Sequence, residues 1–290
     1  MRQIDDFFWD QPPSTLFHYT GIDALLGIAK SKSVWASSAY YLNDSKEIAY
    51  ACEVLERVIQ PYQMADNRSA DEKEFLDNVK NWVSSCKTTT YNIFIFSLSE
   101  EGSLLSQWRS YTPHGKGISI GFPPSLVKRI RTNSSMRLAK CLYESQEQEE
   151  LVHSLILKML TTFNRDKSSI DTSQNHPTQK YHQYLETFRG DVLQVLAIIK
   201  HRAFSEENEW RLVSTYHPNY TVQTIKFRQG ASMLVPYIEL QLGEQQPYFE
   251  TVILGPSPHQ NLSFSALSMF LSNQRLCNKT ENSLLPYREW

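Results

Sequence analysis

The sequence predicts an α+β fold built on a mixed β-sheet with flanking helices. The segments "TYNIFIFSLSE" and "GKGISIGF" are strongly β-prone. Four further β-like segments follow late in the chain, "NEWRLV", "QTIKF", "MLVPYIEL" and "FETVILGP". Because helices do not separate these strands regularly, repeated βαβ units are not expected. We therefore expect residues 1–290 to form a single α+β domain.

The first elements are expected to be a strand, a capped helix and a second strand. "LFHYT" is β-prone, and Thr20 with Asp23 in "TGID" has the spacing of a helix-capping box. Ile22, Leu25 and Leu26 begin a helical apolar stripe, and "VWAS" returns to β character. These patterns place His18 on a strand that ends where a helix begins.

Helical patterns fill most of the remaining chain. Helices are expected from about 45 to 58, 71 to 85 and 263 to 273, and "SLLSQWRSYTPHGKG" should be a short helix or loop. Residues 144 to 164 and 179 to 200 read as two helices around a polar loop. This pair predicts a helical insertion at about 144–200, with an apolar stripe that must be buried.

Bulk properties exclude several classes of protein. The net charge of −2 gives no general attraction to nucleic acid or to an anionic membrane. The start "MRQIDDFFWDQPP" lacks the pattern of a signal peptide, and no apolar run is long enough to cross a bilayer. The four cysteines are far apart, which favours free, buried thiols. We expect a cytoplasmic protein without a membrane partner.

The stretch "FSEENEWRLV" combines acidic residues with an arginine and a tryptophan. If residues 207 to 213 form a strand, Glu207, Glu209 and Arg211 share one face, and Trp210 and Leu212 share the other. A surface strand with solvated carboxylates explains this pattern. A functional site on the charged face is the alternative.

Three further positions carry candidate chemistry, each with a structural alternative. His18 shares a strand face with Leu16 and Thr20, and a satisfied structural histidine is the ordinary interpretation. Asn43 in "LNDSKE" either belongs to a helix cap or lines a cleft. Trp108 and Tyr111 lie three apart, so they form either core contacts or an aromatic wall for a planar ligand.

Several familiar chemistries lack their motifs. There is no GxSxG elbow, HExxH pair, CxxC knuckle, kinase set or nucleotide-binding glycine loop. The histidines have no paired metal-ligand spacing. A site without metal, built from one histidine, aromatic rings and a carboxylate, remains possible.

The motifs and their order resemble a known family. "LFHYTGIDALLGIAKSKSVWAS", "YLNDSKE", "FIFSLSEEGSLLSQWRSYTPHGKGISIGF", "FSEENEWRLV", "VILGP" and "SLLPYRE" together span nearly the whole chain. They are similar to the bacterial domain-of-unknown-function family two-nine-seven-one, which is often met in phage-defence and abortive-infection settings. A more distant likeness to ADP-ribosyltransferase folds follows from it.

The likeness to ADP-ribosyltransferases implies roles for individual residues. His18 would hold the adenine-side ribose of NAD, Ser37 would occupy the second-strand position, and Glu209 would be the catalytic carboxylate. Glu207 is the alternative carboxylate, and Arg211 would orient Glu209 or meet a phosphate. The implied NAD-binding set is His18, Tyr19, Thr20, Ser37, Asn43, Trp108 and Tyr111, of which Trp108 and Tyr111 match the family motif without an assigned role.

The expected function is that of a cytoplasmic NAD-consuming effector in defence or in a toxin system. NAD would be its substrate, no metal would be needed, and the acceptor of ADP-ribose would be protein, nucleic acid or water. An antitoxin or another defence protein would be a partner. The alternative is a noncatalytic sensor or interaction module whose cleft binds a nucleotide or a phage component and whose helical insertion signals to a partner. A nuclease is disfavoured because no acidic metal cluster is evident.

Overall fold

The computed structural model describes residues 2–42, 46–171, 180–218, 224–230, 232–283 and 285. It confirms the α+β class and the mixed sheet: within these residues one sheet contains ten strands, and all pairs except β9 with β10 are antiparallel. The strands are β1 (Leu16–Thr20), β2 (Ser33–Ser38), β3 (Phe94–Ser99), β4 (Ile118–Phe122), β5 (Arg137–Lys140), β6 (Glu209–Val213), β7 (Lys226–Gln229), β8 (Leu234–Gln241), β9 (Thr251–Leu254) and β10 (Thr280–Asn282).

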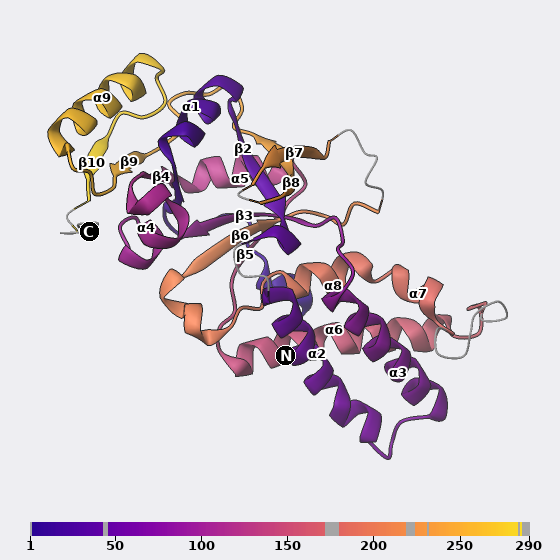
Figure 1. The fold of residues 1–290 in the computed structure, drawn as a ribbon. Coiled ribbons are helices and arrows are strands. Elements are labelled where there is room, and N and C mark those ends of the chain that lie inside the picture. The colour runs from indigo at the N-terminus through magenta and orange to yellow at the C-terminus, as the bar shows by residue number, and fades with distance from the viewer. Residues whose placement is uncertain are drawn as a thin grey trace.

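Helices cover both faces of this sheet. Figure 1 shows α2, α3, α6, α7 and α8 gathered on one side, with α1 and α9 near the opposite end. The helices are α1 (Ile22–Ser31), α2 (Glu47–Met64), α3 (Ala70–Ser84), α4 (Leu105–Tyr111), α5 (Pro124–Asn133), α6 (Ser145–Asp166), α7 (His182–Glu186), α8 (Arg189–Leu196) and α9 (Gln260–Asn273).

Two hydrophobic cores lie on the opposite faces of the sheet. Ile95 and Val213 belong to the core shared with α2, α3, α6 and α8. Their neighbours Phe96 and Leu212 belong to the core shared with α1, α5 and α9. This alternation is the period of two that strand geometry imposes. The central strands β3 and β6 are therefore covered on both faces.

The sheet forks at β3. One edge of β3 pairs with β6 from Ile95 to Ser99. The other edge pairs with β1 only at Ser99, and with β2 only at Phe94 and Ile95. The C-terminal half of β1 and the N-terminal half of β2 therefore leave β3 in different directions, and α1 connects them. The middle of this edge of β3 is left open between the two arms.

The expected insertion is helical where the structure describes it, in α6, α7 and α8. These helices share one core with α2 and α3. The predicted apolar stripe is buried there, as expected. It comprises Leu151, Leu155, Ile156 and Met159.

The structure differs from the expectations at three places. Thr20 does not cap α1, because it remains in β1 and pairs with Ile118, so Gly21 precedes the helix. Helix α2 continues to Met64 through Pro61, beyond the expected end near residue 58. Helix α5 and strand β5 were not expected, although a proline at the start of α5 and its buried Leu126, Val127 and Ile130 are helix signals.

Candidate functional site

A cleft of about 620 Å³ lies at the fork of the sheet. Its lining includes His18 and Thr20 of β1, Ser37 of β2 and Tyr111 of α4. A recess of about 40 Å³ also contacts His18 and Tyr111 and reaches Glu207 and Glu209. The fork thus brings together seven residues predicted from distant parts of the sequence, including Tyr19, which also lines the recess. The cleft has the size of a site for a small molecule.

His18 lies where β1 leaves β3. Its Nδ1 is 2.9 Å from the carbonyl oxygen of Ser97, in the stretch of β3 that pairs with neither arm of the fork. A carbonyl only accepts, so Nδ1 carries the proton and donates it. Burial lowers the pKa of His18 and outweighs the opposing effect of this hydrogen bond. The neutral ring therefore retains Nε2 as a hydrogen-bond acceptor in a residue that lines the cleft.

Glu209 and Arg211 form a buried ion pair on β6. The two guanidinium nitrogens Nε and Nη2 of Arg211 lie 2.8 and 2.9 Å from the two carboxylate oxygens of Glu209. Glu209 is 5% exposed and Arg211 is 2% exposed. The interpretation as a solvated surface strand is therefore wrong, because β6 lies between β3 and β5 and both of its faces are covered. Of the two roles predicted for Arg211, orienting Glu209 is the one its position allows.

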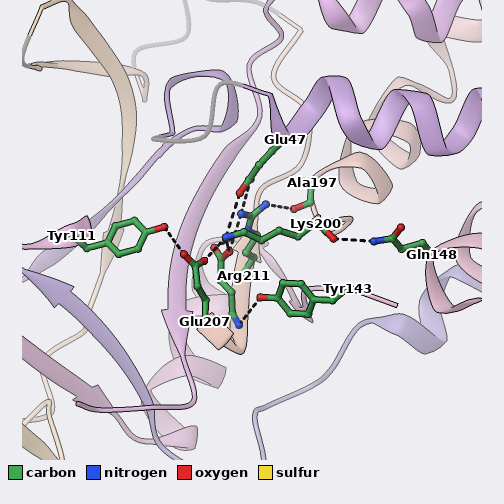
Figure 2. A network of polar contacts seen from close by, with 9 residues as sticks. Glu47, Tyr111, Tyr143, Gln148, Ala197, Lys200, Glu207 and Arg211 are labelled. Carbon is green, nitrogen blue, oxygen red and sulfur yellow. Dashed lines mark hydrogen bonds and ion pairs between the residues drawn. The ribbon is translucent and has the colours of Figure 1, made fainter. Parts of the chain in front are cut away.

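Lys200 and Glu47 complete this buried cluster, which Figure 2 shows converging from separate elements. The Lys200 ammonium lies 2.6 Å from Glu209 and 3.3 Å from Glu47, and it also contacts Glu207. Arg211 Nη2 donates to Glu47 at 2.7 Å. We call Glu47, Lys200, Glu207, Glu209 and Arg211 the charge cluster.

The charge cluster is fixed further by neutral groups. Nη1 of Arg211 donates to the carbonyl of Ala197 at 2.6 Å, and the Tyr143 hydroxyl accepts from the Glu209 backbone N–H at 3.0 Å. Gln148 donates to the Lys200 carbonyl at 2.9 Å. Buried charges require such partners, since an unpaired one is strongly destabilising. Glu209 is buried and accepts from two cations, Arg211 and Lys200, so this carboxylate has a structural role in the geometry observed.

The pKa values of the cluster follow from these contacts. Burial disfavours the charge of Glu209, but Arg211 and Lys200 overcome it and hold the pKa at about 2. Burial also disfavours the charge of Lys200, yet Glu209 and Glu47 raise its pKa above the usual value. Lys200, Glu209 and Arg211 are therefore all charged near neutral pH.

Glu207 differs from Glu209 in position and in titration. It ends the 3₁₀ turn η6 (Arg202–Glu207), and Asn208 then adopts the left-handed conformation with φ of 41°, which asparagine tolerates. The strand begins only at Glu209, so the alternation expected from residue 207 is wrong. Burial raises the pKa of Glu207, and contacts with Lys200 only partly offset it.

The Glu207 carboxylate lines the recess. One oxygen accepts a hydrogen bond from the Tyr111 hydroxyl at 3.2 Å, and the other contacts Lys200. The backbone carbonyl of Glu207 is anchored by the Ser99 hydroxyl at 2.8 Å. Tyr111 is 38% exposed and lines both the cleft and its recess. Glu207 contacts one cation, Lys200, and the partly exposed Tyr111, whereas Glu209 contacts two buried cations, so Glu207 is better placed than Glu209 to meet a ligand.

The two aromatic residues predicted together have separate roles. Trp108 is fully buried, its ring packs against Tyr19 at 4.8 Å between centroids, and a Cβ on Gly255 would lie 2.8 Å from it. An aromatic wall formed by Trp108 is therefore wrong for this structure, because core packing covers the ring. The Tyr19 ring is buried with it, and its hydroxyl donates to the Glu101 carbonyl at 2.6 Å. Only Tyr111 of the pair faces the cleft.

The sequence interpretation missed several residues that line the site. Trp35 and Arg228 line the cleft beside Ser37, and Glu47 and Lys200 build the charge cluster. Lys200 had a signal, because a lysine that directly follows the apolar run "VLQVLAII" must either emerge to solvent or find buried partners. The predicted Asn43 lies outside the described residues.

In the described part of the chain, no group of three or more His, Cys, Asp or Glu side chains is arranged to hold a metal ion. The four cysteines are free and buried, as expected. No helix among the described residues is both long and apolar enough to cross a membrane.

Comparison with known proteins gives a family and no named relative. Residues 107–212 match the family described as Protein of unknown function (DUF2971). This match confirms the predicted resemblance to the family over residues 107–212. The matched segment includes Tyr111 and, in the charge cluster, Lys200, Glu207, Glu209 and Arg211. No curated protein and no solved structure matches the chain.

Proposed function

We propose that the protein is an NAD-consuming enzyme of the ADP-ribosyltransferase or NAD glycohydrolase type. The family resemblance supports a role as an effector of anti-phage defence or of a toxin system. The acceptor of ADP-ribose would be protein, nucleic acid or water. An antitoxin or defence protein would restrain or trigger such an effector.

One observation carries this proposal: the neutral His18 and the Glu207 carboxylate line the same recess at the fork of the sheet. The arrangement agrees with the implied ADP-ribosyltransferase likeness, in which an early strand provides histidine and a late strand provides glutamate. Here β1 provides His18, β2 provides Ser37, and Glu207 lies two residues before the start of β6. The likeness therefore supports the proposal with Glu207 in place of Glu209.

The chemistry requires a negative charge near the anomeric carbon of the nicotinamide riboside. The bond between C1′ and the nicotinamide nitrogen breaks, and its electron pair leaves with neutral nicotinamide. Positive charge then develops on the ribosyl ring, where a carboxylate stabilises it. Water or another acceptor forms the new bond to C1′ and releases a proton. Glu207 would provide the carboxylate, and Nε2 of His18 would accept a hydrogen bond from a ribose hydroxyl.

The charge cluster would position Glu207 for this step. The Lys200 ammonium contacts one oxygen of Glu207 and is itself held by Glu209 and Glu47. Tyr111 holds the other oxygen. A carboxylate fixed in this way does not need to reorganise as charge develops, which is the basis of electrostatic catalysis.

The test is nicotinamide release from NAD by the wild-type protein and by Glu207→Gln, with and without cell lysate. We expect the wild type to release nicotinamide and Glu207→Gln to lose at least about 100-fold in rate, since one preorganised electrostatic group is worth that much. The matched control is Glu206→Gln, which neutralises the exposed neighbouring carboxylate and should retain wild-type activity.

The outcomes separate an enzyme from a binding module. Equal rates for wild type and Glu207→Gln would contradict the proposed role of Glu207. If NAD binds in the cleft and no condition yields nicotinamide, the proposed activity is wrong and the noncatalytic sensor remains.

A further inference from the structure

We propose that the outer part of the cleft is a subsite for a nucleoside diphosphate, with the base stacked on Trp35 and a phosphate held by Arg228. This inference deepens the proposed function and rests on it in one respect. It assigns the ADP half of NAD to the arm of the fork formed by β2, β7 and β8. It leaves the nicotinamide half beside Glu207.

Trp35 provides the aromatic surface. It stacks on Tyr237 with ring centroids 4.4 Å apart and planes 29° apart, so one face of its ring is covered. It is nevertheless 43% exposed and lines the cleft. Its neighbours Val34 and Ala36 are buried on the opposite face of β2, so the ring lies on the open face of this strand. Aromatic rings of this kind stack on nucleobases without strong preference for one base.

Arg228 provides the positive charge. It lies on β7 and lines the same cleft, and its Nη2 donates to the hydroxyl of Ser37 at 3.3 Å. Within the described part of the chain no carboxylate forms an ion pair with Arg228. A guanidinium held by a neutral hydroxyl can still bind phosphate through several N–H groups. This contact also gives the predicted residue Ser37 a role, as a support for Arg228.

The remaining polar lining fits the sugar. Asp23 of the first turn of α1 lines this part of the cleft and offers an acceptor for hydroxyl groups. An aromatic surface, a hydroxyl acceptor and a guanidinium in one cleft correspond to the base, ribose and phosphate of a nucleotide. An aromatic peptide would use the ring and leave the acceptor and the cation without partners.

The inference is tested by isothermal titration of the full-length protein with ADP, adenosine and pyrophosphate. ADP carries no nicotinamide, so its binding is independent of any cleavage. We expect Trp35→Ala to weaken binding of ADP and adenosine by about tenfold or more and to leave pyrophosphate unchanged. Arg228→Gln should weaken ADP and pyrophosphate by about tenfold and leave adenosine unchanged.

Matched controls lie on the same strand as Arg228. Phe227→Ala removes an exposed aromatic ring, and Lys226→Gln removes a cation that pairs with Glu239. Both variants should bind ADP like the wild type. Trp35→Phe keeps a ring and should retain ADP affinity within about threefold, which guards against a folding defect in Trp35→Ala.

Two results would overturn the subsite. One is the absence of ADP binding to the wild type at millimolar concentration. The other is ADP binding that neither Trp35→Ala nor Arg228→Gln changes. ADP binding that depends on both residues, without nicotinamide release from NAD, would leave the subsite standing and overturn the proposed activity alone.

Discussion

The recess and the cleft at the fork of the sheet, which we call the inner and outer ends of the site, are built in opposite ways. At the inner end, Glu209 of the recess is buried and forms hydrogen-bonded ion pairs with Lys200 and Arg211. At the outer end, Trp35 is exposed and Arg228 rests on a single hydroxyl. The inner end has its final geometry without a ligand. The outer end presents groups whose best partners would come from one.

This difference indicates that the inner end positions Glu207 and that the outer end recognises a ligand. A buried charge cluster is costly to assemble and does not guarantee stability compared with an apolar core, so its retention calls for a further reason. Here the cluster holds Glu207 at the edge of the recess. Exposed side chains cost less free energy to accommodate in the fold, but ordering them adds to the cost of binding a ligand. The comparison predicts large stability effects at the inner end and binding effects at the outer end.

The largest effect is expected from Lys200→Met, which removes a cation shared by three carboxylates. Breaking a buried ion pair typically costs about 3–5 kcal/mol, so the melting temperature should fall by on the order of 10 °C. The control Lys226→Met breaks a half-exposed pair with Glu239 and should cost less than about 1 kcal/mol. Similar melting temperatures for the two variants, measured by circular dichroism, would contradict the comparison.

A smaller effect is expected from Tyr111→Phe. The hydrogen bond from Tyr111 lowers the pKa of Glu207, so its loss should raise that pKa further above its usual range. The ionised form is the one that would stabilise positive charge. As the pH is lowered, Tyr111→Phe should therefore lose any activity at a higher pH than the wild type does. Carboxyl ¹³C NMR titration of Glu207 measures the shift directly.

The control for this titration is Tyr62→Phe, which removes a hydroxyl that contacts His153 away from the cleft. It should leave the pKa of Glu207 unchanged. A pKa of Glu207 that falls in Tyr111→Phe would show that the tyrosine acts on it in the opposite sense.

Much of the fold could be predicted from local pattern. The alternation of "NEWRLV" and "LFHYT" assigned the two faces of β6 and β1, and the apolar stripe of α6 required the burial that is observed. Strand pairing could not be predicted in the same way, because it depends on contacts between residues far apart in the chain. The fork of the sheet is therefore visible only in the structure.

The sequence identified several residues of the candidate site but did not predict the role of each one. Glu207, Glu209 and Arg211 stood out as charges around a buried tryptophan. The different roles of the two glutamates depend on Lys200 and Glu47, which come from other parts of the chain and lie beside β6 only in the folded protein. Asn208 also matters, since its left-handed turn separates Glu207 from the strand. Sequence alternation alone made the two glutamates look alike.

The central claim is that Glu209 is structural and that Glu207 is available to a ligand. Burial raises the pKa of Glu207, so its charge opposes folding once the pH exceeds its unfolded pKa, and its neutralisation should not destabilise the protein. The pKa of Glu209 is held at about 2, so its charge stabilises the fold above the unfolded pKa of about 4.3. That contribution is lost as the pH falls toward 2.

The most direct measurement is urea denaturation of the wild type, Glu207→Gln and Glu209→Gln at pH 7. The account predicts a free energy of unfolding for Glu207→Gln within about 1 kcal/mol of the wild type or above it. For Glu209→Gln it predicts a loss of about 3–5 kcal/mol. Equal losses in the two variants, or a larger loss in Glu207→Gln, would contradict the division of roles between these carboxylates.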